Sequence, residues 1–291
     1  MTFHAASREA LAAAELKLLD ALGGSAAPSK PAARSRATKA SSAATSSDQL
    51  GSELFSVVRL LDREVGLRRA IGDSSADPDR REQLIRGLLS GKVSEQALDV
   101  LVATVRARWS TPRELVDGID QLGRTALLVR AERDGRLDSV EDELFRFSRI
   151  VAGDTRLEQA LTDRNTPGEA KAELLATLIG NQAEDVTVRL IEQLVLAPQG
   201  RALVVGLGDL AAEAAKRRER SVAYVVSAGP LTEQQQERLA ATLHRIYARP
   251  IALHVEVDPS IQGGLVIKVG DEVIDGSATG RIDELRRRLA G

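Results

Sequence analysis

The sequence predicts an α+β protein, in which an N-terminal all-α helical bundle with a duplicated helical unit precedes a small α/β C-terminal domain. Three observations predict this class. Long segments without Gly or Pro carry apolar residues at helical spacing, the chain resembles itself at an offset of 90 residues, and the apolar period becomes strand-like after residue 220. The 291 residues are long enough for two domains of ordinary size.

The composition excludes several classes of protein. Hydrophobic residues make up 43% and charged residues 28% of the chain, as in globular proteins. Forty basic against forty-two acidic residues give a net charge of -2, so no overall field attracts nucleic acid. Cys is absent, which excludes disulfides and thiolate sites and suits a reducing cytoplasm. No apolar run reaches the length of a membrane helix and the N-terminus is unlike a signal peptide, so we expect neither insertion nor export.

Residues 1–22 are predicted to hold the first helix and residues 23–49 a flexible linker. Apolar residues on the helix cover an arc of roughly 200°, wider than a one-sided surface helix needs; they are Leu11, Ala12, Ala14, Leu16, Leu18, Leu19 and Leu22. One part of this arc could face a core and another a partner, or the whole helix could be buried in its own bundle. Gly, Ser, Ala, Pro and Thr dominate residues 23–49, which is typical of a solvated tether.

A duplicated helical unit follows the linker. Residues 52–55 (S-E-L-F) align with residues 142–145 (D-E-L-F), and the match continues at the same offset over apolar helical positions. We therefore expect an extra helical copy in residues 50–138 and a second copy in residues 139–220. Each copy is predicted to be a helix, a break at Asp73 or Asp163, and two further helices.

Each copy contains an apolar helix face that could pack in the bundle or form a ligand groove. Helix packing explains both faces and is the favoured interpretation. The two faces are Leu98, Leu101, Val102 and Val105 in one copy, and Val186, Leu190, Ile191, Leu194 and Val195 in the other.

Residues 221–291 are predicted to form the α/β domain. Alternation predicts strands at residues 222–226, 251–257, 265–269 and 272–275, a helix from Thr232 to Tyr247, and a last helix after Gly276. Gly270 and Asp271 fit a two-residue hairpin turn.

No constellation of catalytic, cofactor-binding or metal-ligating residues is predicted. Residues 87–92 and 206–208 depart from phosphate-loop and dinucleotide patterns, and Gly263-Gly264 precedes a strand rather than a helix N-terminus. The three histidines, His4, His244 and His254, lack metal-ligand spacing. We therefore expect no cofactor and no activity from this chain alone.

The C-terminal segment resembles the delta subunit of the rotary, proton-driven ATP synthase, called the oligomycin-sensitivity-conferring subunit in mitochondria. The resemblance covers residues 222–289 and is carried above all by Gly263-Gly264 and by residues 269–277 (V-G-D-E-V-I-D-G-S). Upstream, residues 145–219 are similar to the later helices of the family's N-terminal bundle, and residues 7–22 to its first helix. The linker and the extra copy depart from the usual family pattern.

The resemblance implies a non-catalytic peripheral-stalk stator, held at the cytoplasmic face of the cell membrane only through its complex. The helical domain would bind N-terminal segments of the alpha subunits, and the C-terminal domain would bind the C-terminal region of the b subunit. By family position, the first helix and residues 186–197 would form the groove for the alpha segment, so Leu190 and Leu194 should be sensitive to replacement by Asp. Alternatives are a free-standing helical adaptor with an unrelated partner and, least favoured, a nucleotide-dependent enzyme.

Overall fold

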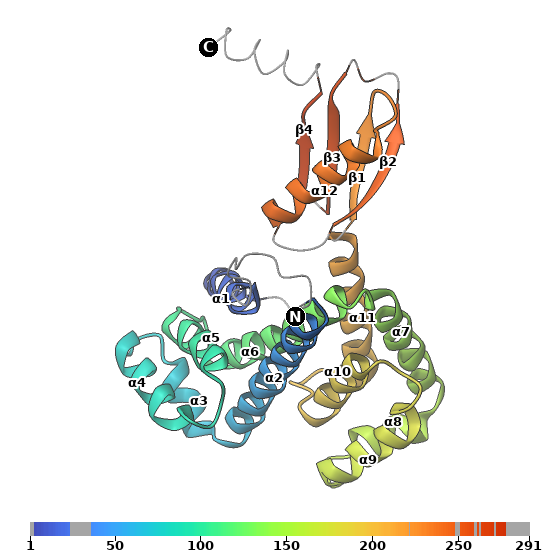
Figure 1. Cartoon of the computed structure of the whole chain (residues 1–291). Coiled ribbons are helices and arrows are strands. Elements are labelled where there is room, and N and C mark those ends of the chain that lie inside the picture. The colour runs from blue at the N-terminus through green and yellow to red at the C-terminus, as the bar shows by residue number, and fades with distance from the viewer. Residues whose placement is uncertain are drawn as a thin grey trace. The chain divides into compact units, whose positions relative to one another are not determined.

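The computed structural model describes residues 3–23, 36–220, 222–247, 251–258, 261, 263–270 and 272–277, without the side chains of residues 23, 36–46 and 220. The chain divides into two compact units. A helical unit comprises Met1–Ala131 and Asp142–Ala211, and a C-terminal unit comprises Glu132–Glu141 and Ala212–Gly291. The predicted fold class, an all-α part followed by a small α/β domain, is confirmed (Figure 1).

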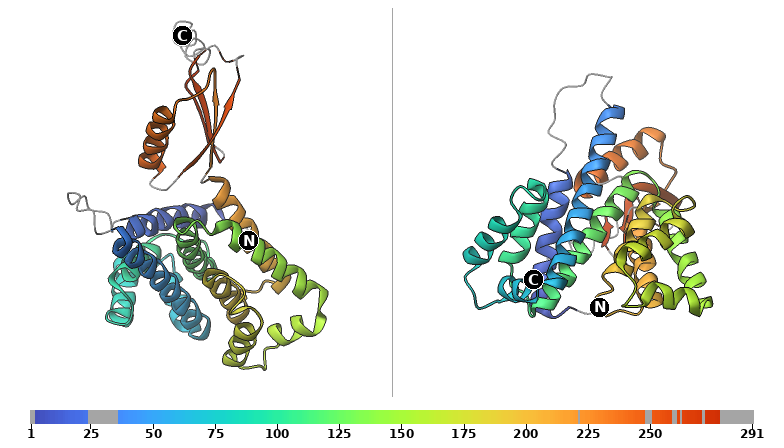
Figure 2. Two further views of the ribbon diagram at one scale, coloured as in Figure 1. Left: turned by 45° about the vertical axis from the view of Figure 1, so that its right-hand side comes forward. Right: turned by 90° about the horizontal axis from the view of Figure 1, so that it is seen from below.

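The helical part runs in the predicted order of a first helix and two copies, which lie beside each other in both views of Figure 2. The first helix is α1 (Ala5–Gly23). The first copy comprises α2 (Arg36–Arg63), α3 (Val65–Gly72), α4 (Pro78–Leu89), α5 (Glu95–Arg106) and α6 (Pro112–Arg133). The second copy comprises α7 (Leu137–Gly153), α8 (Thr155–Thr162), α9 (Gly168–Ile179), α10 (Asp185–Leu196) and α11 (Leu203–Arg220).

The copies repeat individual hydrogen bonds as well as helices. The carboxylate of Glu53 accepts the backbone N–H of Ser94 at 3.1 Å, and that of Glu143 accepts the N–H of Glu184 at 3.0 Å. Asp73 accepts the N–H two residues later at 2.9 Å, and Asp163 does so at 3.0 Å. The two aspartates therefore end α3 and α8 in the same way, as the sequence predicted.

Helix α2 corrects the predicted linker. It begins at Arg36, so residues 36–49 are helical rather than part of the tether. This stretch contains neither Gly nor Pro, and Ala, Lys and Arg in it favour a helix, although its serines and threonines hide the apolar period. The second half of the predicted linker, residues 36–49, is therefore part of α2.

The largest apolar cluster joins α1 to the helices of the first copy. Trp109, in the connection between α5 and α6, is fully buried there and donates its indole N–H to the carbonyl oxygen of Thr104 at 2.8 Å. Its ring lies so close to α6 that a Cβ at Gly118 would be 2.2 Å from the ring edge. The glycine is therefore required by packing.

The C-terminal unit contains, within its described residues, a four-stranded sheet in the order β2-β1-β3-β4. The strands are β1 (Val222–Ser227), β2 (Ala252–Val257), β3 (Leu265–Val269) and β4 (Glu272–Asp275), and α12 (Glu233–Tyr247) lies between β1 and β2 in the chain. Strand β1 is parallel to β2 and antiparallel to β3. Leu243 of α12 shares a separate small core with Ala223, Val225 and Ile267.

The sheet explains the paired glycines that precede β3. Gly263 and Gly264 have φ values of 87° and 89°, which other residues rarely adopt. A Cβ at Gly264 would lie 2.3 Å from the carbonyl oxygen of Gly276, so the two backbones approach too closely for a side chain. The predicted last helix lies outside the described residues, and Gly270, with a φ of 59°, opens the predicted hairpin between β3 and β4.

Candidate partner-docking surface

Helix α1 carries two apolar stripes, one buried and one exposed. The buried stripe of Leu11, Ala14, Leu18 and Leu22 packs into the helical core. The second stripe is exposed: Leu16 is 70% exposed and Leu19 37%, and both lie near Ala12, one turn or two away. We call Ala12, Leu16 and Leu19 the α1 stripe. The interpretation that the whole helix is buried was therefore wrong, and the width of the arc reflects two separate faces.

The N-terminal end of α1 is fixed on the start of α6. Glu114 accepts hydrogen bonds from the hydroxyl of Ser7 and the backbone N–H of His4, while the hydroxyl of Ser7 accepts the N–H of Ser110 at 2.9 Å. Partial burial acts to raise the pKa of Glu114, but these hydrogen bonds outweigh it and the pKa lies below the usual value. The α1 stripe thus lies on an anchored helix.

Among the residues that the structure describes, the first helix and residues 186–197 do not pack together into the expected groove. Helix α1 packs mainly on α5 of the first copy, whereas α10 is the equivalent helix of the second copy. Leu190 and Leu194 are buried in the core, so Asp at either position would disrupt folding rather than report on docking. The choice of copy depends on tertiary contacts, which the periodicity of α1 does not encode.

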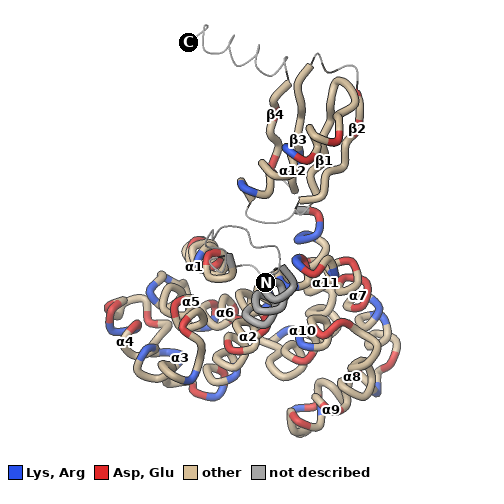
Figure 3. Tube along the Cα trace, in the orientation of Figure 1, with Lys and Arg blue, Asp and Glu red and all other residues tan. Residues whose placement is uncertain are grey.

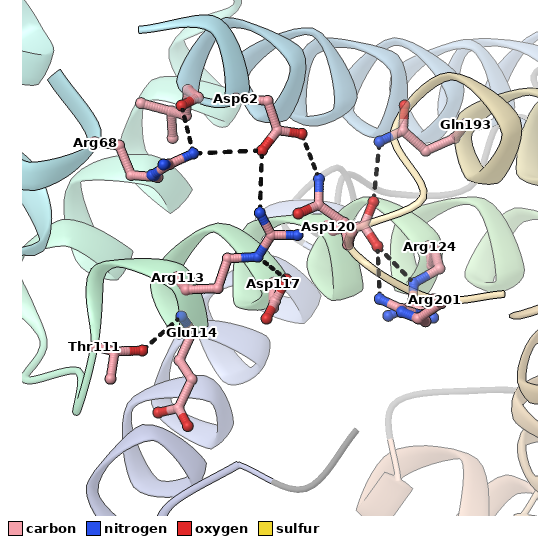
Figure 4. A network of polar contacts seen from close by, with 12 residues as sticks. Asp62, Arg68, Thr111, Arg113, Glu114, Asp117, Asp120, Arg124, Gln193 and Arg201 are labelled. Carbon is pink, nitrogen blue, oxygen red and sulfur yellow. Dashed lines mark hydrogen bonds and ion pairs between the residues drawn. The ribbon is translucent and has the colours of Figure 1, made fainter. Parts of the chain in front are cut away.

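Helix α10 instead makes polar side-chain contacts with helices of the first copy (Figure 4). The amide of Gln193 accepts a hydrogen bond from Arg59 of α2 at 2.8 Å and donates one to Asp120 of α6 at 3.0 Å. Arg189 donates to Ser52 of α2 at 3.1 Å. Side chains of α2 and α6 therefore both bond to α10.

A buried polar network extends from this joint (Figure 4). Asp120 lies 3.3 Å from the Nε of Arg124 and 3.4 Å from Arg201. Asp62 of α2 accepts from Gln199 at 2.7 Å and pairs with Arg113 at 3.5 Å. Such a network joins the copies through directional contacts in addition to apolar packing.

A metal site requires a cluster of ligating side chains, and a membrane-spanning helix requires a long apolar run. Among the residues that the structure describes, no group of three His, Cys, Asp or Glu side chains could hold a metal ion, and no helix is long and apolar enough to cross a membrane. Gly206 packs against Leu194, as a helix-packing glycine should. Acidic and basic residues are interspersed over the helices (Figure 3).

Comparisons with known proteins give the same family as the sequence motifs. A family model described as the ATP synthase delta (OSCP) subunit matches residues 124–289. The ATP synthase subunit delta of Streptomyces coelicolor is 46% identical over 99% of this chain and 98% of its own length. That of Nocardia farcinica is 48% identical over 89% and 97%, respectively. These alignments span the extra helical copy.

One solved structure also matches part of the chain. A chain of the Toxoplasma gondii mitochondrial ATP synthase hexamer aligns with 58% of this chain and 95% of its own length, at 20% identity and a TM-score of 0.29. A score this low describes no shared overall arrangement.

The family match begins inside α6, earlier than the sequence analysis placed it. Residues 124–127 (R-T-A-L) repeat residues 8–11 (R-E-A-L) at the start of α1, and the Ala and Leu of both motifs are buried. The end of α6 therefore corresponds to the first helix of the second copy. This repeat was missed in the sequence analysis because its offset is 116 residues, whereas the other helices repeat at an offset of 90. The larger offset arises because the linker and the start of α2 separate the first helix from the rest of the first copy.

The matched model covers more than half of the chain, and the relatives align over nearly all of it. The chain belongs to the ATP synthase delta (OSCP) subunit family, whose members are non-catalytic subunits.

Proposed function

We propose that the chain is a peripheral-stalk stator of a proton-translocating ATP synthase. In this role its helical unit binds N-terminal segments of the alpha subunits on the catalytic head, and its C-terminal domain binds the C-terminal region of the b subunit. Together these contacts resist the torque of the rotor. The chain acts at the cytoplasmic face of the cell membrane, reaches the membrane only through the complex and binds no nucleic acid.

The α1 stripe is the observation that carries the alpha part of the proposal. Leu16 and Leu19 are exposed on a helix that is otherwise packed and anchored. An amphipathic segment that lays apolar side chains along such a stripe removes their surface from water. The alpha segment is the occupant that the family membership suggests, and it requires no rearrangement of the core.

The first copy is the better site because polar side chains of α2 already bond to α10, the helix of the second copy that is equivalent to α5. Helix α2 contacts α10 through Arg59 and Ser52, on the side where α6 also meets it. An alpha segment that docks there would compete with these hydrogen bonds. We therefore assign one alpha segment to α1, with α5 beneath it.

The C-terminal domain is assigned to the b subunit. It has its own core, in which α12 packs on one face of the sheet. On the other face, side chains of paired residues form a row across the strands: His254, Tyr224, Lys268 and Val273. Tyr224 and Val273 are exposed in this row, which offers apolar contacts to a helical partner.

Native mass spectrometry tests the proposal. The purified chain is mixed with the catalytic head of its own organism before and after proteolytic removal of the alpha N-termini. One copy bound to the intact head and none to the trimmed head is the expected result. A chain that binds neither head would contradict the stator role and favour a free-standing adaptor with another partner. Equal binding to both heads would reject the alpha N-termini as the docking segment.

A further inference from the structure

A pocket of about 910 Å³ lies in the helical unit where the end of α2, the start of α9 and the connection from α10 to α11 meet. We call it the α9 pocket. Five basic side chains and three carboxylates line it. The basic residues are Arg59, Arg63, Arg164, Lys171 and Arg201, and the acidic residues are Asp62, Glu158 and Glu169.

Lys171 is the most unusual of these residues. It is only 8% exposed and lines the pocket. Within the described part of the chain, its ammonium group makes no hydrogen bond and no ion pair within 4 Å, although its charge helps to lower the pKa of the neighbouring Asp163. A side chain that is largely covered but whose ammonium group makes no hydrogen bond is suited to an anion that enters the pocket.

The N-terminus of α9 opens into the same pocket without a side-chain cap. Its N-cap residue is Pro167, which makes no capping hydrogen bond, and Gly168 and Glu169 of the first turn line the pocket. The first backbone N–H groups of a helix have no partner within the helix, and the helix dipole favours negative charge beside them. An oxyanion in the pocket would satisfy both the amides and Lys171.

The first copy shows what these groups do when they are satisfied internally. Asp77, at the position of Pro167, accepts the N–H of Asp79 at 2.9 Å and caps α4. Arg81, at the position of Lys171, donates to the carbonyl oxygens of Ala107 and Arg106 at 3.1 and 3.3 Å. Both internal partners are thus lost in the second copy, at two neighbouring positions that line one pocket.

The other charged groups of the pocket leave an excess of positive charge that an anion could neutralise. Asp62 is engaged by Gln199 at 2.7 Å and by Arg113 at 3.5 Å. The Nε of Arg201 is buried without a hydrogen-bond partner, although another nitrogen of the guanidinium lies 3.4 Å from Asp120. Glu158 and Glu169 are the remaining carboxylates, against five basic side chains.

We propose that the α9 pocket binds a phosphate group, either as inorganic phosphate or as part of a phosphorylated small molecule such as a nucleotide. Lys171 and the first amides of α9 hold its oxygens, and Arg164 and Arg201 supply further positive charge. No aromatic side chain lines the pocket, so the phosphate and not a base is recognised. Because α2 also borders the pocket, a bound anion would tie the two copies together.

Isothermal titration calorimetry with the full chain tests this site at constant ionic strength, with chloride as the background anion. Inorganic phosphate is expected to bind once per chain. The double variant Pro167→Asp/Lys171→Arg gives the second copy the residues that cap the first, so it should fold while phosphate affinity falls at least tenfold. Lys171→Met should weaken binding similarly, whereas Lys92→Met removes a positive charge from an exposed turn and should bind as the wild type does.

ADP is the second probe. Tighter binding of ADP than of phosphate, lost in the same double variant, would identify a nucleotide as the source of the phosphate group, and equal or weaker binding would identify free phosphate. The proposal is overturned if neither probe binds to the wild-type chain. It is also overturned if the folded double variant binds phosphate as tightly as the wild type. Neither result depends on binding to the catalytic head.

Discussion

Replacing Leu16 and Leu19 together by Asp should weaken binding of the chain to the catalytic head without unfolding the chain. Both side chains lie on the α1 stripe and project away from the buried stripe of the same helix. Asp at position 16 mostly meets water in the free chain, whereas at position 19, where Leu is 37% exposed, it also removes packing worth about 1–2 kcal/mol. The lower helix propensity of Asp adds a smaller cost at both positions. In the complex, the same carboxylates would lie against the apolar face of the alpha segment.

The expected loss follows from the area that docking would cover. Burying a whole leucine side chain is worth about 1.5–3 kcal/mol. Leu16 is 70% exposed and Leu19 is 37% exposed. Complete burial of these exposed parts by the alpha segment would therefore stabilise the complex by about 1–2 kcal/mol for Leu16 and about 0.6–1.1 kcal/mol for Leu19. The sum of about 1.6–3 kcal/mol corresponds to an increase in Kd of about 15- to 150-fold. Desolvation of the new carboxylates would add to it.

Surface plasmon resonance with immobilised head measures this change, and circular dichroism checks that each variant is folded. Leu178→Asp is the matched control, since Leu178 is 38% exposed on α9 of the second copy and the substitution adds the same kind of charge. The control should bind as the wild type does. A folded Leu16→Asp/Leu19→Asp variant with unchanged Kd would refute the assignment of the alpha segment to α1.

Three further substitutions test the packing, the electrostatics and the joint between the copies. Gly118→Ala should lower the free energy of unfolding in urea by about 1–3 kcal/mol because the new Cβ would collide with Trp109. Gly208 is the control: it occupies the same position in the second copy, and a Cβ there would have no atom within 4 Å. Gly208→Ala should therefore leave the stability unchanged or raise it by up to about 1 kcal/mol. Burial raises the pKa of Asp117, so its contribution to stability is present at low pH and is lost as the pH rises through its folded pKa. The stability of Asp117→Asn relative to the wild type should therefore increase as the pH rises above about 4, the ordinary pKa of an aspartate, and a constant difference would contradict this. Gln193→Leu should broaden the distances between spin labels on α4 and α9, and unchanged distances would show that the network does not fix the joint.

Local signals predicted much of the fold. The breaks at Asp73 and Asp163 are confirmed because a short acidic side chain bonds the backbone two residues on, whatever the tertiary context. The strands of the C-terminal domain were predictable because alternation and paired glycines mark a sheet with one packed face. The family motif lies on these same residues, so the motif and the physical pattern agree.

The docking surface was harder to predict because it depends on contacts between segments distant in sequence. The wide apolar arc of α1 indicated a second face, but the helix that α1 packs on is decided by residues such as Glu114, more than 100 positions away. The start of α2 was missed because Ser and Thr mask a helical period. The role of the end of α6 was missed because its repeat follows a different offset from the other helices.

The dual role of α6 explains how an extra helical copy can be added without a hinge. Its start follows α5 as the last helix of the first copy, and its end, from Arg124, corresponds to the first helix of the second. A continuous helix fixes the spacing of the two copies, and the bonds of Gln193 to Arg59 and Asp120 fix how α10 is rotated against α2 and α6. Buried polar groups of this kind add little net stability, yet they disfavour other pairings because each would leave a charge unpaired. A chain that carries torque, as proposed here, needs this specificity more than it needs additional stability. If the two copies were loosely joined, they would move relative to each other before the torque was transmitted to the C-terminal domain.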